Sequence, residues 1–451
     1  MNLHFSLSDK RRFESIEDNK SIKMKDQVMK VSDRTRSGGR VLARCLLGSC
    51  LAILAGLTAL QAQASIVEIT AAFSPDPNNP QVNTFQNTTP NSGLCATFPY
   101  ICSPQGLFSI SLGFEALTQY PIPANHANTR DGAMIKVPAE DRTVMVTSTT
   151  GDTAEVKFTI TAFSATNRTV SIPLITGIPR SSGQLAQRDL WGTRWGEAAG
   201  LPCIRGTNVT TDSVSDADYF WLTPDSAACG KSPLFEIPWL RMRNSSGAYL
   251  MTTPDPLKME SGIYRGSITY TVGPGGDFDF GDNLVATDNI VTMNFTLSVE
   301  HTLKFQFPAG YGSVVLNPAG GWQQWLNNGR RPQKLTADQG FKMWASTQFS
   351  IGLQCEYAVG DQCAIKNPAG DAVPVETRVT LPYGLRDASN QAVSRLLLST
   401  NPQVFTPGHY VDNRPAALHF EVARDQVKSM IDDHSGSTYK GNITVIWNSE
   451  V

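Results

Sequence analysis

The stretch YKGNITVIWNSEV, residues 439–451, stands at the end of the sequence and reads as a well-formed β-strand. Its residues 443, 445 and 447 are apolar and alternate with outward positions, as in a strand with one buried face. A closely similar phrase, YRGSITYTV, spans residues 264–272, and there the chain continues into a further alternating strand at 290–299. The earlier copy therefore predicts a complete sheet, and the later copy predicts a sheet that lacks its final strand.

A missing final strand admits two interpretations. In the first, the sheet closes with another of its own strands or has a six-strand topology. In the second, another polypeptide supplies the strand, since an unpaired edge beside an open apolar groove invites aggregation. Donor-strand complementation of pilins is a known form of such strand addition. The internal similarity alone leaves both interpretations open.

The first 64 residues have the layout of an export signal. Basic residues precede an apolar run at 45–60, and Ala62-Gln63-Ala64 forms a small-residue cleavage site before Ser65. The apolar run is too short to span a bilayer, which favours a secretory signal peptide over a membrane anchor. The basic stretch is long, and a translation start at Met24 or Met29 would shorten it. We therefore expect residues 1–64 to be an N-terminal extension and signal peptide.

The remaining chain is acidic and long enough for two or three domains. Without residues 1–64 it carries 27 Lys and Arg against 34 Asp and Glu, a net charge of about −7. Nucleic-acid binding relies on the neutralisation of phosphates by Lys and Arg, so this composition argues against that class of partner.

Six cysteines follow the predicted signal peptide, in three local pairs. An even number in an exported chain implies disulfides, and proximity favours three pairings among the fifteen possible. A zinc site is disfavoured because no pair has CxxC spacing and the histidines are scattered. No metal or other cofactor is expected. The predicted disulfides join Cys95 to Cys102, Cys203 to Cys229, and Cys355 to Cys363.

The texture after residue 64 is β throughout, with alternating runs broken by Gly, Pro, Asn and Asp. Residues 154–164 and 168–177 look like neighbouring strands across a short turn, and 423–433 is the best candidate for a helix. A fresh alternating strand begins at 302, directly after the strand at 290–299. We predict an all-β fold of two immunoglobulin-like β-sandwich domains end to end, the second without its final strand.

The predicted boundaries place the first domain at residues 65–300 and the second at 301–451. In each domain a strand and a polar or helical crossing lead into Tyr-(Arg/Lys)-Gly-(Ser/Asn)-Ile-Thr, beginning at Tyr264 and at Tyr439. A tyrosine at such a corner resembles the tyrosine corner of immunoglobulin-like sandwiches.

Several phrases together resemble the CfaE/CblD family of minor tip pilins and pilus initiators of alternate chaperone–usher fimbriae. VVLNPAGGWQQWL at 314–326 resembles the family's strand with a Pro-x-Gly-Gly turn, and Cys355 sits in the following strand, as a cysteine does in the family. The stretch at 439–451 resembles the family's closing strand. In the first half, the order of the two cysteine pairs and of the strand entering at Thr302 is also similar.

The resemblance implies an N-terminal adhesin domain followed by a pilin domain that accepts a donor strand. Such a subunit has no donor strand of its own, so it stands at the fimbrial tip and initiates assembly. The implied partners are a periplasmic pilus chaperone, an outer-membrane usher, the donor strand of a major pilin, and a host glycan or protein receptor. The implied location is the cell surface, reached through the periplasm.

The expected donor-strand groove is built from two strands of the second domain. Its residues share an inward-facing position in an alternating run, and an acidic substitution at Val445 is expected to abolish chaperone capture by burying a charge. The groove residues are Ile443, Val445 and Trp447 on one side, with Leu303, Phe305 and Phe307 on the floor.

The receptor does not follow from the resemblance. Members that agglutinate red cells carry a basic cluster in the hairpin after the first Tyr-x-Gly strand, whereas here residues 273–283 are acidic and contain no Lys or Arg. Asp277, Asp279 and Asp282 hint at calcium but lack EF-hand spacing, so we expect a solvated hairpin tip. Trp191, Arg194 and Trp195 are the best sequence candidates for a receptor contact, unless they belong to the core.

Enzymatic activity is not expected, because no nucleophile elbow, HExxH, P-loop or dinucleotide fingerprint is present. Two alternatives remain open: a secreted carbohydrate-active enzyme whose carboxylates converge from distant strands, and a stand-alone carbohydrate-binding surface module. The sequence thus predicts an exported, non-enzymatic tip subunit of a fimbria.

Overall fold

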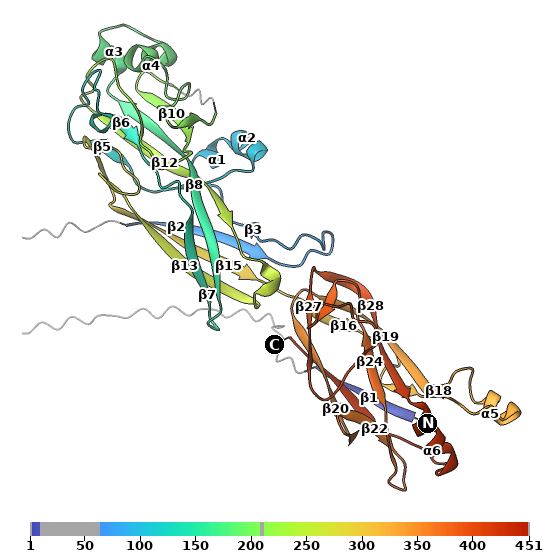
Figure 1. Cartoon of the computed structure of the whole chain (residues 1–451). Coiled ribbons are helices and arrows are strands. Elements are labelled where there is room, and N and C mark those ends of the chain that lie inside the picture. Colours follow the sequence, from blue (N-terminus) through green and yellow to red (C-terminus); the bar gives the residue numbers. More distant parts are fainter. Residues whose placement is uncertain (1, 10–63, 208–211, 450–451) are drawn as a thin grey trace, which may run out of the picture. The chain divides into compact units, whose positions relative to one another are not determined.

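The computed structural model describes residues 2–9, 64–207 and 212–449. The fold is all-β, with strands in several sheets and six short α-helices in this part of the chain (Figure 1). In the same described residues, no helix is both long and apolar enough to cross a membrane. The predicted signal peptide lies almost wholly outside the described residues.

The strands up to residue 299 are β1 (Asn2–Asp9), β2 (Ala64–Phe73), β3 (Gln86–Asn87), β4 (Phe108–Ser111), β5 (Ala116–Thr118), β6 (Ala133–Ile135), β7 (Arg142–Ser148), β8 (Thr153–Thr169), β9 (Ile204–Arg205), β10 (Asp216–Leu222), β11 (Cys229–Lys231), β12 (Leu240–Thr252), β13 (Gly262–Thr271), β14 (Leu284–Ala286) and β15 (Ile290–Val299). The helices of this half are α1 (Leu94–Thr97), α2 (Pro99–Cys102), α3 (Ile172–Thr176) and α4 (Gly183–Trp191).

The later strands are β16 (Leu303–Gln306), β17 (Ser313–Val315), β18 (Asn317–Pro318), β19 (Leu335–Ala345), β20 (Phe349–Cys355), β21 (Tyr357–Val359), β22 (Gln362–Lys366), β23 (Ala372–Pro374), β24 (Glu376–Thr380), β25 (Leu385–Asp387), β26 (Leu396–Leu397), β27 (Gln403–Pro407), β28 (Val411–Val422) and β29 (Asn442–Asn448). The helices of this half are α5 (Gln323–Asn328) and α6 (Arg424–Asp432).

The first half, residues 64–299, is organised by one large sheet. Its path runs β14-β5-β12-β8-β7-β13-β15-β2-β3, and β10 and β4 pair with β8 and β12 off this path. Strand β8 extends over 17 residues and pairs with β7 along one part of its length and with β10 along the other. The prediction of two neighbouring strands at 154–164 and 168–177 is wrong. Residues 153–169 form one long strand, β8, and the helix α3 follows it.

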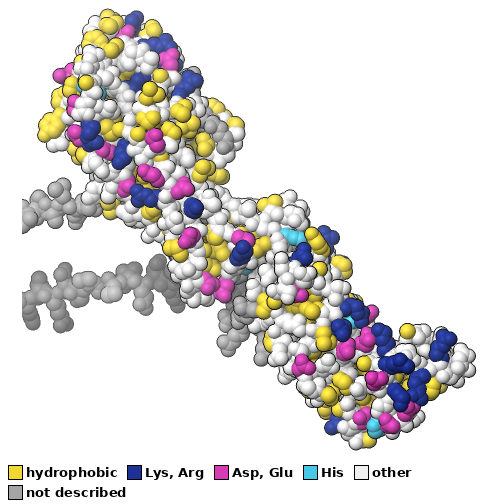
Figure 2. Space-filling model, viewed as in Figure 1, with side chains coloured by type: hydrophobic (Ala, Val, Ile, Leu, Met, Phe, Trp, Pro, Cys, Tyr) yellow, Lys and Arg dark blue, Asp and Glu magenta, His cyan; other side chains and the backbone are white. Residues whose placement is uncertain are grey.

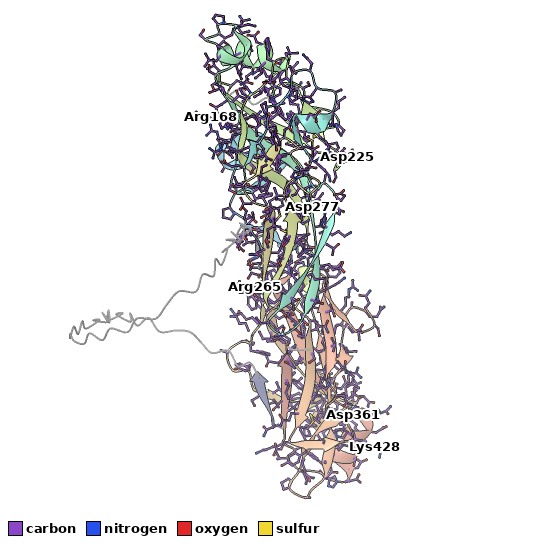
Figure 3. All side chains as sticks on the ribbon, turned by 90° about the vertical axis from the view of Figure 1, so that its left-hand side faces the viewer. Arg168, Asp225, Arg265, Asp277, Asp361 and Lys428 are labelled. Carbon is purple, nitrogen blue, oxygen red and sulfur yellow. A yellow bond between two sulfur atoms is a disulfide. The ribbon has the colours of Figure 1, made fainter. Side chains whose placement is uncertain are left out.

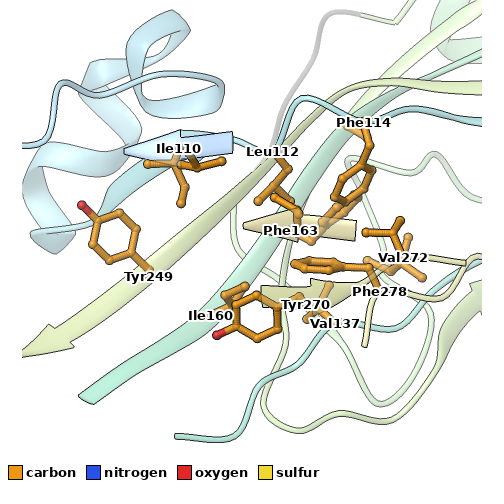
Figure 4. Packing of buried hydrophobic residues seen from close by; sticks show 14 of the residues in the cluster. Ile110, Leu112, Phe114, Val137, Ile160, Phe163, Tyr249, Tyr270, Val272 and Phe278 are labelled. Atoms are coloured by element: carbon orange, nitrogen blue, oxygen red, sulfur yellow. The ribbon is translucent and has the colours of Figure 1, made fainter. Parts of the chain in front are cut away.

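One main hydrophobic core fills most of the first half. The alternation predicted for β15 is confirmed: Val291, Met293, Phe295, Leu297 and Val299 are buried. Aromatic rings from distant segments meet in this core, where Phe278 lies 5.3 Å from Phe114 and 5.8 Å from Tyr270 between ring centroids (Figure 4).

The second half, residues 303–448, consists chiefly of two sheets around a second core. One sheet has the order β17-β1-β29-β20-β27-β25, and the other runs β16-β19-β28-β24-β26. Inward-facing residues of both sheets form the core. The helix predicted at 423–433 is confirmed as α6, which buries Val427 and Met430 on one face.

The three predicted disulfides are present. Cys95 is bonded to Cys102, Cys203 to Cys229, and Cys355 to Cys363. Each bond closes a local loop, in agreement with the proximity argument from the sequence.

Several charged groups of the second half form ion pairs. Figure 2 shows Lys and Arg gathered at the end of this half that carries α5 and α6, interspersed with acidic side chains. Arg331 and Lys428 both contact Asp432, while Lys334 and Arg395 share Glu421. This cluster of alternating charge is therefore not a bare basic patch.

Candidate functional site

The candidate site is the edge of β29 in the second half. On one side β29 pairs antiparallel with β20, from Ser350 opposite Asn448 to Cys355 opposite Ile443. On its other side β29 pairs, among the described residues, with β1, which comes from residues 2–9 near the N-terminus of the chain. Figures 1 and 3 show the blue strand β1 lying among the orange strands of the second half.

Strand β1 fills the gap between β29 and β17. It runs parallel to β29, with Phe5 opposite Ile443 and Leu7 opposite Val445, and antiparallel to β17, with Leu3 opposite Val314. Its sequence, NLHFSLSD, alternates apolar and polar residues as a strand beside a core requires. No strand from residues 64–207 or 212–449 stands between β29 and β17.

The first half shows how a sheet of this kind is completed by its own chain. There β15 pairs antiparallel with β13, which carries the first Tyr-x-Gly phrase, and parallel with β2 on the other side. β29 carries the corresponding phrase in the second half, and β1 takes the position beside it that β15 takes beside β13. In the second half this position is filled by β1, between β29 and β17.

The inward face of β29 is apolar and buried. Ile443 and Val445 are fully buried and Trp447 is 4 % exposed, with β1 in place. The rings of Trp447 and Phe305 have centroids 4.2 Å apart, so one predicted floor residue contacts the predicted groove side. Leu303 is buried in the same core, and the centroid of Phe307 lies 4.9 Å from that of Phe341, which in turn packs against Trp447.

The second rim of this place comes from a strand that the sequence analysis did not assign to the groove. β16 pairs with β19 in the opposite sheet, but the chain then crosses through residues 308–312 and β17 joins the sheet of β29. Val314 and Leu316 from this crossing segment are buried in the core. Their alternation within VVLNPAGG at 314–321 is the sequence signal that could have identified them.

The two tyrosines of the repeated phrase have different partners. The hydroxyl of Tyr264 donates a hydrogen bond of 3.2 Å to the carbonyl of Glu260, four residues upstream, as in a tyrosine corner. The hydroxyl of Tyr439 instead donates to the carboxylate of Asp371 at 2.6 Å. The second corner is therefore fastened to the loop before β23 rather than to the preceding backbone.

The aromatic receptor candidates lie inside the protein. Trp195 is fully buried and stacks on Trp221 at 4.6 Å between centroids, and Trp191 is 5 % exposed and meets Trp195 edge to face. Arg194 is also 5 % exposed and is paired with Asp212 at 2.8 Å. Trp191, Arg194 and Trp195 therefore agree with the alternative that the sequence left open, namely that they belong to the core, because neither indole presents a free ring face to a receptor.

The acidic hairpin at 273–283 also folds inward. Phe278 and Phe280 are buried, and Asp279 is only 1 % exposed. The expectation of a solvated hairpin tip holds for Pro274, Gly275 and Asp282, which are exposed. It is wrong for residues 277–280, where two phenylalanines alternate with the aspartates and draw the segment onto the core.

Arginines neutralise this hairpin. Arg130 contacts both Asp279 and Asp282. Arg142 contacts Asp277, which is labelled in Figure 3, at 2.6 Å. Burial raises the pKa of Asp279, but hydrogen bonds from Arg130 and from two backbone amides outweigh it and hold the pKa below its usual range. In the described residues these aspartates form ion pairs and do not gather as a metal site.

No protein-family model matches the sequence, and no curated protein matches it. Among solved structures, the chain is similar to the CsuC–CsuE chaperone–tip adhesion subunit pre-assembly complex from archaic chaperone–usher Csu pili of Acinetobacter baumannii. The identity is 9%, the match covers 86% of this chain and 99% of that chain, and the TM-score is 0.19. The geometry of β1, β17 and β29 stands independently of this similarity.

Proposed function

We propose that this chain is the tip subunit of a chaperone–usher fimbria, and that its second half accepts a strand from another polypeptide between β29 and β17. A periplasmic chaperone supplies that strand first, and a major pilin replaces it when the usher assembles the fimbria. The single observation that carries the proposal is the place taken by β1: an extended, alternating segment inserted between two strands that otherwise have no partner there among the described residues.

The length of the insertion supports strand exchange. Six residues of β1 are in register with β29, and the neighbouring inward side chains of β29 belong to the main core of the second half. Without an inserted strand, the backbone groups of β29 and the apolar core beneath them would face water. If export removes residues 1–64, as the sequence predicts, β1 is lost and a strand from outside must replace it.

The position at the tip is supported by β2. Over ten residues β2 pairs with β15, from Ala64 opposite Ile290 to Phe73 opposite Val299. A chain cleaved before Ser65 would therefore begin inside the sheet of the first half, with no leading segment left to complete a neighbouring subunit. A subunit that accepts a strand but donates none can occupy only the first position of the fibre, where its first half is placed to contact a receptor.

The test is strand complementation of residues 65–451 in solution. The chain is secreted alone, and a peptide of residues 2–9 is added in excess. The control peptide has Phe5→Ser and Leu7→Ser, which removes two apolar residues in register with the apolar face of β29. We expect aggregation or early melting without a strand, and a monomer with a higher melting temperature with the first peptide.

The expected rise can be bounded. A ligand at 100 times its Kd stabilises the folded state by about 2.7 kcal/mol, which corresponds to roughly 5–10 °C for a domain of this size. A monodisperse chain that melts sharply without either peptide, and is unaffected by both, would contradict the proposal and reopen the enzyme and binding-module alternatives.

A further inference from the structure

A small disulfide-bonded cap covers part of the first half's large sheet. The cap comprises α1 and α2, residues 94–102, and the bond between Cys95 and Cys102 closes it. Its Leu94 and both cysteines pack on Ala162, Phe220 and Ala248 in a small apolar cluster distinct from the main core. The cap therefore sits on the outer face of β8, β10 and β12, as Figure 1 shows.

The cap approaches the sheet closely at one point and leaves a cavity beside it. Gly93 has φ of +65°, and a Cβ there would lie 2.3 Å from the Cβ of Ser246, so only glycine permits this approach. Beside Gly93, residues of the cap and of the strands line a cavity of about 580 Å³ that is open to solvent. This volume lies within the range of small-molecule sites in proteins.

Short polar side chains on β8 and β12 line this part of the fold. Ser164, on the cavity wall, shares a hydrogen bond of 2.6 Å with Ser246, and the hydroxyl of Thr166 donates to Asp218 at 2.5 Å. Ser164 and Thr166 are both buried, at 4 % and 8 % exposure. Their hydroxyls are therefore held in fixed orientations before any ligand arrives.

A β-bulge supplies the rim. The register between β12 and β8 shifts between Arg243 and Ser246, and Asn244 within this bulge has φ of +56°. The bulge turns Asn244 toward the cavity, where its amide nitrogen lies 3.4 Å from the hydroxyl of Thr166. Bulges of this kind commonly aim a side chain at a binding site.

The composition of the wall selects the ligand. Among the described residues that line the cavity, Asp218 carries the only formal charge and no Lys or Arg is present, which disfavours anions. Serine, threonine and asparagine both donate and accept hydrogen bonds, as the vicinal hydroxyls of a sugar require. Phe98 also lines the cavity, and its ring adds an apolar surface on which the C–H face of a sugar ring can pack.

We infer that this cavity binds a neutral saccharide of one or two rings. The inference deepens the proposed adhesive role of the first half, on which it rests, by naming the class of receptor. It involves none of the residues of the groove between β29 and β17.

The test is saturation-transfer difference NMR with residues 65–451, both halves together, kept folded by an excess of the peptide of residues 2–9. The probes are methyl α-D-mannopyranoside, methyl β-D-galactopyranoside, methyl N-acetyl-β-D-glucosaminide and, as the anionic comparison, 3′-sialyllactose. Asn244→Gly removes the rim amide and retains the left-handed backbone conformation. Phe98→Ala is a second variant. The matched control is Asn125→Gly, since Asn125 also has positive φ, at +51°, but does not line the cavity.

We expect at least one neutral glycoside to show saturation transfer, and its affinity to fall by about fivefold or more in Asn244→Gly and in Phe98→Ala, as for a lost hydrogen bond or apolar contact. Asn125→Gly should bind as the parent does. The inference is overturned if no neutral glycoside binds, if only 3′-sialyllactose binds, or if both cavity variants bind as the parent. None of these results bears on whether the peptide raises the melting temperature, so failure of the groove and failure of the cavity remain distinguishable.

Discussion

Side chains along β29 alternate between a buried face and a half-buried face. Ile443, Val445 and Trp447 are buried, whereas Thr444 and Ile446 are half-buried on the other face. Successive side chains of a strand point to opposite faces of the sheet, so neighbouring positions of one strand serve as test and control.

Val445→Asp should abolish stable uptake of the donor strand. A carboxylate at this position would lie in the core without a partner, at a cost on the order of 3 kcal/mol or more. The matched control is Thr444→Asp, which places the same charge on the half-buried face. Co-purification with the pilus chaperone and urea unfolding of the peptide-bound chain measure the effect. Equal recovery of the Val445→Asp and parent complexes would refute the assignment of this face.

Residue type alone did not reveal exposure in the first half. Trp191, Arg194 and Trp195 have the composition of a sugar or hot-spot contact, yet Trp195 is sandwiched against Trp221. Trp221 comes from β10, and the sequence contains no signal that brings these two indoles together. The cavity residues Ser164, Thr166 and Asn244 were missed for a related reason, since a serine or a threonine in a strand looks like an ordinary solvent-facing residue.

At the scale of elements, the hairpin at 273–283 shows how packing changes the meaning of charge. Its aspartates alternate with Phe278 and Phe280, which are buried. Each carboxylate that accompanies them inward is paired with Arg130 or Arg142. The inner part of the hairpin, residues 277–280, is thus packed on the core and held by ion pairs, so its stability must depend on pH.

The first half should lose stability in acid through this hairpin. For Asp277 and Asp279 burial raises the pKa, but hydrogen bonds and the nearby arginines outweigh it and lower both values below 3.8. The unfolded chain therefore binds protons before the folded chain does, so their contribution is complete above about pH 4 and declines as the pH falls through the lower folded values. Urea unfolding between pH 6 and pH 2.5 measures it.

Arg130→Gln provides the variant for this measurement. With the arginine gone, burial dominates at Asp279 and its pKa rises, so the acid loss should begin at a higher pH. Arg180→Gln is the control, because Arg180 pairs with Asp189 at the surface and its loss should change little. Superimposable pH profiles of Arg130→Gln and the parent would show that the hairpin is not held by this pair.

At the scale of the whole molecule, two separate cores imply two independent responses to a donor strand. The core of the first half is completed by β15 and β2, whereas in the second half β1, from residues 2–9, lies between β29 and β17. Under the proposed function a strand from another polypeptide takes that place. A strand added in solution should therefore act on one half and leave the other unchanged.

Amide hydrogen exchange on residues 65–451 tests this directly. We expect the amides of β29 and β17 to exchange rapidly without a strand and to become protected when the peptide of residues 2–9 is added. Amides of β13 and β15 should be equally protected in both conditions and serve as the internal control. Full protection of β29 without any added strand would show that the second half closes by itself.

Local patterns predicted much of this architecture. Alternation identified β15 and β29, the helix candidate at 423–433 is α6, and sequence proximity identified the three disulfides. These features depend on residues close together in the chain, so the period of the apolar residues and the spacing of the cysteines are sufficient to predict them. The same local view divided β8 wrongly, because a strand of 17 residues is sustained by successive partners that lie far away in the sequence.

The sequence by itself determined that the chain is all-β, that its cysteines pair locally, and that the phrase at 439–451 forms a strand with one apolar face. Only the tertiary structure decided where that strand lies, which second rim receives it, which aromatic residues are buried, and where a polar cavity opens beneath the cap. Strand pairing and cavity formation arise from contacts between segments far apart in the chain, and no local period records which segments will meet.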